Sequence, residues 1–199
     1  MDAVRVALLR DVLAGTEWLG ATRHFAGVLR SSVVSHGGGL LLVGTPAYEP
    51  WHLAAHLTDE AAWSGTPELA PTLVRHGARP SDPAHLAVGL GRLEAARRGE
   101  TLLVVAPDEP EPLLGRVHEA RRAGATVLAL GCGQGDLATL AHETLPVPQG
   151  AELDLDTVQH LVSAAAGENP RWAPRGPGRL RDRLSRLAEY LTAPPPPRW

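Results

Sequence analysis

The sequence has 199 residues, of which 44% are hydrophobic and 21% charged, and its net charge is −3. This length suits one well-buried domain, and the chain is too apolar to be intrinsically disordered. The single cysteine, Cys132, excludes an intramolecular disulfide framework and a cysteine-rich zinc site. No apolar run approaches the length of a membrane span, about 20 residues, and the N-terminus lacks the features of a signal peptide. We therefore expect a soluble, cytoplasmic protein without a membrane partner.

The first half of the chain predicts helices that alternate with two short strands. Apolar residues recur at helical spacing over residues 2–35, and Gly15 and Gly20 indicate a break between two helices. The further predicted elements are a strand at 40–43, a helix from Pro50 to about Trp63, a strand at 72–74 and a helix at 86–98.

The second half continues this alternation. It predicts strands at 101–105 and 126–130, a short edge strand at 145–148, and helices at 113–123, 136–142 and 156–166. Strands separated by helices indicate βαβ units. The predicted fold is a three-layer αβα sandwich with a five-stranded, mainly parallel sheet. We divide the chain into N-terminal helices (1–36), which we expect at an interface, an α/β domain (37–168) and a basic, proline- and arginine-rich C-terminal segment (169–199) with one amphipathic helix predicted at 179–191.

Two histidines and a carboxylate recur along the predicted helix after Pro50. His52, His56 and Glu60 stand at i, i+4 and i+8, so they share one side of that helix. Imidazoles one turn apart can chelate a zinc-like ion, and a carboxylate beside them can transfer protons. The alternative interpretation is a polar helix face, or histidines satisfied by hydrogen bonds.

Two loops follow predicted strands at the edge of the sheet where ligands bind in such folds. Residues 106–112 hold three prolines and three carboxylates, including Asp108 and Glu109, which favours a rigid acidic loop or a site for a cation or an amine. Residues 131–136 form a glycine loop without the lysine of a phosphate-binding loop, so a tight turn with Asp136 as helix N-cap is the favoured interpretation.

From Gly38 to Gly167, the order of segments resembles a sugar isomerase (SIS) domain and is most similar to the bacterial phosphoheptose isomerase branch. The segments that carry the resemblance are the strand and glycine at 39–44, the Ala-x-His-x-x-x-Glu helix at 54–60, the strand entry at 99–104, the helix–Gly–strand segment at 120–130, the approach to the last strand at 140–148, and Gln159-His160 on the terminal helix.

The resemblance implies a metal site and a proton-transfer pair for aldose–ketose isomerisation. Glu60 would be the catalytic base and His160 its acid partner. His56, Glu60, Glu152 and His160 would ligate a zinc-like divalent metal, with His52 as an alternative ligand. The resemblance also implies assembly into dimers or tetramers.

The loops that bind phosphate in that family differ here. Gly44-Thr45-Pro46-Ala47-Tyr48 stands in the first loop, and the acidic loop at 106–112 stands in the second. Thr45, Tyr48, Asp108 and Glu109 are therefore ligand-loop candidates for a small molecule that is not a conventional sugar phosphate. Three functions remain open: binding of such a ligand or a metal at the His/Glu cluster, a non-catalytic scaffold acting through protein contacts, and a divergent phosphosugar isomerase.

The basic residues are unevenly placed. All 19 are arginine, and seven lie in residues 170–199 against Asp182 and Glu189, so this segment carries +5 and the remainder −8. The segment could bind its own body or a neighbouring subunit, form a solvated helix face, or contact an anionic partner. No nucleic-acid-binding motif accompanies the charge, so we do not expect nucleic acid as the partner.

Overall fold

A computed structural model describes residues 13–108, 110–131, 133, 135–148, 150 and 153–168. Its centre is a parallel five-stranded sheet in the order β2-β1-β3-β4-β5. The strands are β1 (Leu40–Val43), β2 (Pro71–Val74), β3 (Thr101–Val105), β4 (Thr126–Gly131) and β5 (Glu143–Pro146). The predicted α/β fold with its parallel sheet is confirmed, and β5 is an edge strand as expected.

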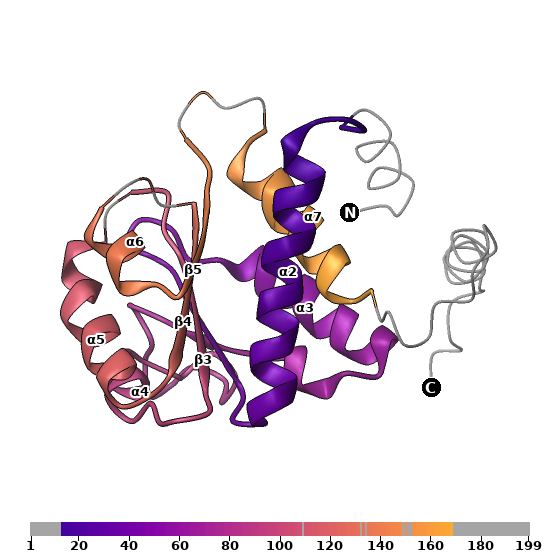
Figure 1. Ribbon diagram of the computed structural model, residues 1–199. Helices are drawn as coiled ribbons and strands as arrows, with labels where there is room; N and C mark the ends of the chain where they lie inside the picture. Colours follow the sequence, from indigo (N-terminus) through magenta and orange to yellow (C-terminus); the bar gives the residue numbers. More distant parts are fainter. Residues whose placement is uncertain are drawn as a thin grey trace.

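Helices cover both faces of the sheet (Figure 1). One layer holds α2 (Glu17–His36), α3 (Trp51–Ser64) and α7 (Leu155–Ala166). The other holds α4 (Gly91–Glu94), α5 (Glu111–Arg122) and α6 (Asp136–Leu140), and a 3-10 turn, η1 (Pro67–Leu69), links α3 to β2. No helix in the described ranges is long and apolar enough to cross a membrane.

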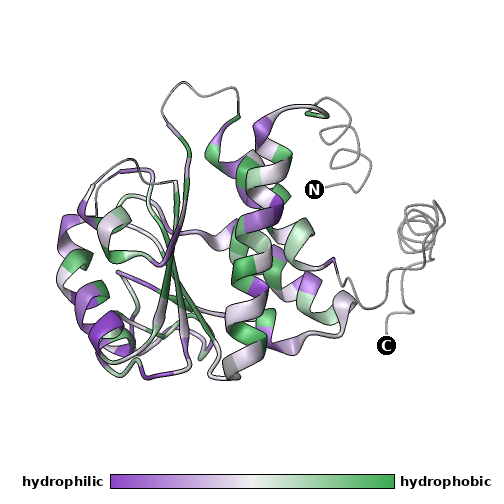
Figure 2. Ribbon diagram, in the orientation of Figure 1, coloured by the Kyte–Doolittle hydropathy of each residue, from purple (hydrophilic) through white to green (hydrophobic). Residues whose placement is uncertain are grey.

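The strands are apolar on both sides because both faces are covered. Leu40 and Leu42 point into the core under α2, α3 and α7, whereas Leu41 and Val43 point into the core under α4, α5 and α6. The same alternation recurs along β3 and β4, and Figure 2 shows the strands as a green band between helices whose outer faces are more polar. This packing fixes the carboxyl ends of β1, β3, β4 and β5 at one edge.

Two predicted features of the helices are wrong. Gly20 does not break a helix, because α2 runs through it from Glu17 to His36. A glycine inside a helix costs about 1 kcal/mol, and the burial of Phe25, Leu29 and Val33 on the same helix outweighs that cost.

The helix predicted at 86–98 is reduced to α4, Gly91–Glu94. The chain there makes turn-like bonds three residues apart, from Arg92 N–H to Gly89 O and from Ala96 N–H to Leu93 O. The segment before α4 is held instead by the Arg75 side chain, whose guanidinium donates to Leu86 O at 3.2 Å. Helical spacing predicts apolar burial here correctly, since Leu93 is buried, but it does not predict the element's length.

Candidate functional site

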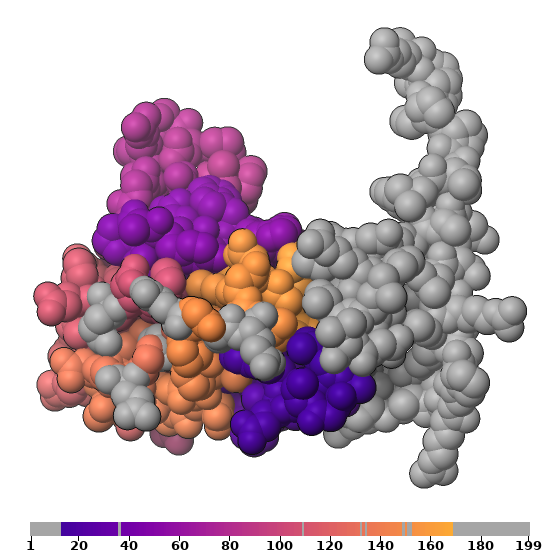
Figure 3. Space-filling view, turned by 90° about the horizontal axis from the view of Figure 1, so that it is seen from above, coloured from indigo at the N-terminus to yellow at the C-terminus, as the bar shows by residue number. Residues whose placement is uncertain are grey.

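Three histidines from two helices meet beside the sheet. His52 and His56 lie in the first two turns of α3, and His160 lies near the middle of α7, which packs against α3. The ring centroids are 4.8 Å apart for His52 and His56, 4.5 Å for His52 and His160, and 4.4 Å for His56 and His160. One nitrogen of each ring lies within 4.8 Å of the others. Seen from above, the purple chain around β1 and α3 and the orange α7 lie side by side (Figure 3).

The environment of His56 and His160 favours the neutral imidazole. Burial lowers the pKa of His56, and the nearby His52 adds to that effect. Burial, reinforced by His56 and His52, lowers the pKa of His160 to about 4. Within the described part of the chain, His56 Nε2 is buried and has no hydrogen-bond partner. Neutral imidazoles offer the nitrogen lone pairs that bind a metal ion.

Glu60 is not part of the histidine cluster, although the sequence predicts that it joins His56 and His160. Its carboxylate lies against Gly167, where an added Cβ would meet Glu60 Oε2 at 1.7 Å. Gly167 follows His160 by seven residues, about 10 Å along a helix axis. The physical reason is helical drift, because each step of four residues turns a further 40° and eight residues turn about 80° away.

Of the other predicted ligands, His52 joins the cluster in the position expected of an alternative ligand. Glu152 lies outside the described residues, as do Glu109 and Cys132. The glycine loop begins at Gly131, and α6 is capped by Gly135 rather than by Asp136, which is the first residue of that helix.

The loop between β1 and α3 is closed by its own hydrogen bonds. The Thr45 N–H donates to Tyr48 O at 2.9 Å, and the Tyr48 N–H donates to Thr45 O at 3.1 Å. The Tyr48 carbonyl also packs on Gly44, where an added Cβ would meet that oxygen at 1.9 Å. Pro46 and Pro50 have no N–H to offer. Thr45 and Tyr48 therefore supply no backbone N–H to an anion in this conformation, although the loop precedes a helix.

The Tyr48 side chain fastens this loop to α7. Its hydroxyl donates to Asp156 Oδ1 at 2.8 Å and accepts from Gln159 Nε2 at 2.7 Å. Burial and the adjoining Asp156 carboxylate raise the pKa of Tyr48 to about 12, although the bond from Gln159 opposes the shift. Tyr48 is thus a neutral phenol that connects the loop to the helix carrying His160.

Arg75, which pairs with a carboxylate at this loop's end, has both of its charge partners within the protein. Arg75, at the end of β2, pairs with Glu49 at 3.1 Å and with Asp82 at 3.0 Å, and its guanidinium lies 4.6 Å from the centre of the Trp51 ring. The Glu49 carboxylate also accepts the His76 N–H at 3.1 Å. The segment that Arg75 anchors stands out in magenta at the edge of the molecule (Figure 3). With two carboxylates bound, Arg75 is poorly placed to hold a phosphate.

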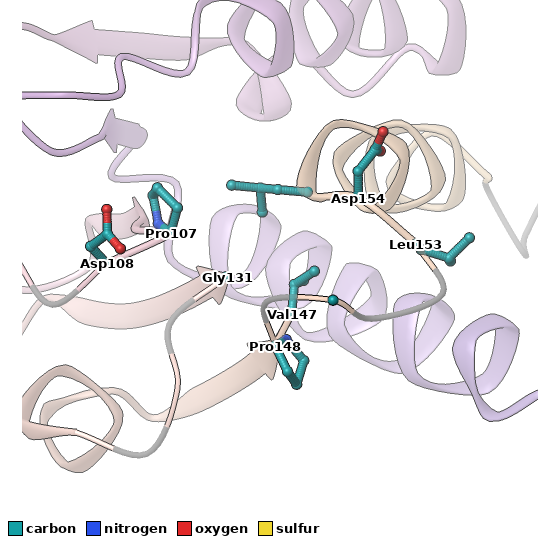
Figure 4. A pocket seen from close by; sticks show the side chains of 9 residues that line it. Pro107, Asp108, Gly131, Val147, Pro148, Leu153 and Asp154 are labelled. Atoms are coloured by element: carbon teal, nitrogen blue, oxygen red, sulfur yellow. The ribbon is translucent and has the colours of Figure 1, made fainter.

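A cavity of about 330 Å³ opens at the carboxyl ends of β3, β4 and β5. Figure 4 shows Pro107 and Asp108 on one side, Gly131 and Val147 beneath, and Asp154 at the start of α7 on the other side. Asp108, one of the predicted ligand-loop residues, lines this cavity. Asp154 was not predicted, although an aspartate just before a predicted helix is a recognisable N-cap, and it accepts the Thr157 N–H at 2.7 Å. The described lining contains two carboxylates and no basic side chain.

Comparison with known proteins identifies the fold. No family model and no curated protein matches the sequence. Among solved structures, the sugar isomerase domain of an RpiR transcription factor from Sphaerobacter thermophilus is similar with a TM-score of 0.50 and 15% identity, over 83% of this chain and 86% of that chain. A protein from Salmonella typhimurium LT2 described as a putative sugar binding protein is similar with a TM-score of 0.53 and 14% identity, over 87% of this chain and 51% of that chain, so this chain spans about half the length of that protein. The chain therefore has the fold of a sugar isomerase domain.

Proposed function

We propose that this SIS-fold protein holds a zinc-like divalent metal on His52, His56 and His160, and that it binds a small molecule other than a conventional sugar phosphate. The observation that carries the proposal is the convergence of three imidazoles from α3 and α7, with one nitrogen of each ring within 4.8 Å of the others. Two of the three ligands come from α3 and the third from α7, so the tertiary packing, and not helical spacing alone, brings the set together.

The donor set suits a zinc-like ion. Three histidine ligands are one of the protein sets that hold catalytic zinc, with bonds of about 2.0–2.1 Å. The buried, unbonded His56 Nε2 supports this assignment because a metal ion would satisfy it. When bound, a metal held by three protein ligands supplies a Lewis acid with a coordination position open to water or substrate. The protein's own contribution is to hold His52 and His56 one turn apart and to pack α7 against them.

The β1–α3 loop and the cavity at the carboxyl ends of the strands favour a neutral or amine-bearing ligand, such as a sugar derivative, over a phosphate. The β1–α3 loop uses the Thr45 and Tyr48 amides internally, and Arg75 is paired with Glu49 and Asp82. Asp108 and Asp154 line the cavity beside α7, so a phosphate there would meet two carboxylates. The ligand-loop roles of Thr45, Tyr48, Asp108 and Glu109 belong to this proposal.

A phosphoheptose-type isomerase is the second candidate, with Glu60 as base and His160 as acid. The burial of Glu60, 8% exposed on the helix that resembles that family, favours it. The position of the carboxylate beside Gly167 makes it the weaker candidate, because proton transfer needs both groups within reach of one substrate. A third candidate, a scaffold acting through protein contacts in a dimer or tetramer, is supported by the use of this fold within a transcription factor.

The metal proposal is tested by equilibrium dialysis of the full chain against Zn²⁺, with bound metal counted by mass spectrometry. We expect about one equivalent in the parent protein and an affinity at least about tenfold weaker after His56→Ala or His160→Ala, since even indirect partners of metal ligands change affinity by that much. The matched control is His118→Ala, an exposed histidine on α5 across the sheet, which should bind like the parent. Equal binding by all these proteins would refute the site.

The isomerase candidate is tested separately with Glu60→Gln. Conversion of a heptose or hexose phosphate by the parent and its loss in Glu60→Gln would favour the isomerase. Zinc binding without any such conversion would favour the ligand-binding function.

A further inference from the structure

The outer side of α3 carries a row of exposed residues that no described element covers, with Trp63 and two alanines beside Asp59 and the polar side chains of His52 and Thr58. Ala55, Asp59, Ala62 and Trp63 are exposed at i, i+4, i+7 and i+8, so they form one stripe along the helix. Trp63 is 66% exposed, the most exposed large apolar side chain in the described part of the chain. Helix α3 contains no lysine or arginine, so the only charge on this stripe is the negative charge of Asp59.

The described chain ends close to this stripe. Arg30 donates to Glu168 O at 3.1 Å and to Thr66 Oγ1 at 2.7 Å, so one guanidinium bridges the end of the described chain and the turn just after α3. Thr66 follows Trp63 by three residues. The C-terminal segment, residues 169–199, therefore departs from the end of α3 that carries the exposed tryptophan.

The sequence of that segment, which lies outside the described residues, complements the stripe. Leu180, Leu184, Leu187 and Leu191 recur at i, i+4, i+7 and i+11, the spacing of one helical face. Arg181 and Arg183 flank this leucine face in a helical projection, and Glu189 lies opposite it. An apolar face bordered by arginines matches a stripe that holds a tryptophan, two alanines and a carboxylate.

We propose that the leucine face of residues 179–191 docks intramolecularly on the Ala55–Trp63 stripe of α3. The connection is long enough, because residues 169–178 can span about 33 Å when extended, whereas the 14 residues of α3 extend over about 21 Å. Docking removes Trp63 and the leucines from water and places an arginine beside Asp59. It also gives the +5 segment a site on the −8 body, which accounts for the charge asymmetry of the chain.

The test places a nitroxide on the C-terminal segment and observes the indole N–H of Trp63 by NMR. The full chain carries Cys132→Ser, to remove its native thiol, and Ser185→Cys for labelling. We expect the Trp63 signal to lose at least half its intensity relative to the reduced label. Adding Leu184→Asp should restore it, and the matched control Glu189→Gln on the opposite face should not. A label on His118→Cys, across the sheet, should leave Trp63 unchanged.

Two results would overturn the proposal. One is a Trp63 signal that is insensitive to the label at position 185. The other is attenuation that appears undiminished when isotope-labelled protein without nitroxide is mixed with nitroxide-labelled protein, because a second copy would then be the occupant. None of the substituted residues is a cluster histidine, so zinc binding can be measured separately in the same variants and the two proposals can fail independently.

Discussion

At the scale of single residues, the phenol of Tyr48 makes a testable pH prediction. Its pKa of about 12 in the fold lies above the usual value near 10. The folded state thus keeps its proton when the unfolded state loses it, so the stability contributed by Tyr48 is complete below pH 10 and falls as the pH rises towards 12. In a Tyr190→Phe background, which leaves Tyr48 as the one tyrosine, ultraviolet titration should place the midpoint well above 10. A midpoint near 10 would contradict the half-buried, hydrogen-bonded geometry of Tyr48.

Gly44 is the residue on which the closed loop depends most directly. An added Cβ would overlap the Tyr48 carbonyl at 1.9 Å and the Pro50 ring at 2.7 Å. We expect Gly44→Ala to lower the free energy of urea unfolding by about 3 kcal/mol, because overlap with backbone cannot be relieved by a rotamer change. The matched control is Gly27→Ala, in the middle of α2 with open space around it, which should raise stability by about 0.5–1 kcal/mol. Equal effects of the two substitutions would show that the loop is not packed as described.

At the scale of elements, Arg30 joins α2 to the ends of α7 and α3. It donates to Ala166 O at 2.6 Å and also reaches Glu168 O and Thr66 Oγ1. Because the last carbonyls of a helix have no partners within the helix, we expect Arg30→Gln to cost about 1.5–3 kcal/mol. Hydrogen exchange should rise selectively in the last turn of α7. The control is Arg23→Gln, on the exposed side of the same helix. An equal loss of unfolding free energy in this control would mean that removing any positive charge from α2 destabilises the protein, and that the hydrogen bonds of Arg30 are not the cause.

The elements also show what can be predicted from the sequence. Short apolar runs predict β1, β3 and β4, because strands buried on both faces need no alternation. The pairing of His52 with His56 follows from helical spacing alone. The position of His160 beside His52 and His56 depends on how α7 packs on α3. Only the family resemblance suggested this long-range contact. The sequence places Glu60 on the same helix face as His52 and His56, but each four-residue step turns a further 40°, so Glu60 is turned about 80° from His52. Its carboxylate lies against Gly167 instead.

At the scale of the whole molecule, the distribution of charge predicts weak phosphate binding. The loops at the ligand edge present Asp108 and Asp154, and Arg75 is held by Glu49 and Asp82. Glucose 6-phosphate and sedoheptulose 7-phosphate should therefore leave the melting temperature unchanged at millimolar concentration, because a ligand stabilises only when its concentration exceeds its Kd. A rise of several degrees with either compound would contradict this prediction, because it would show that the folded protein binds a sugar phosphate.

The proposed metal site is most directly tested with Co²⁺, which reports its own coordination in the visible spectrum. We predict that titration of the full chain gives the absorption of a four- or five-coordinate ion, that it saturates at one equivalent, and that Zn²⁺ displaces it. The absorption should disappear in His56→Ala and persist in His118→Ala. A spectrum no different from that of aqueous Co²⁺, or one that survives His56→Ala, would contradict the assignment of His52, His56 and His160 as a metal site.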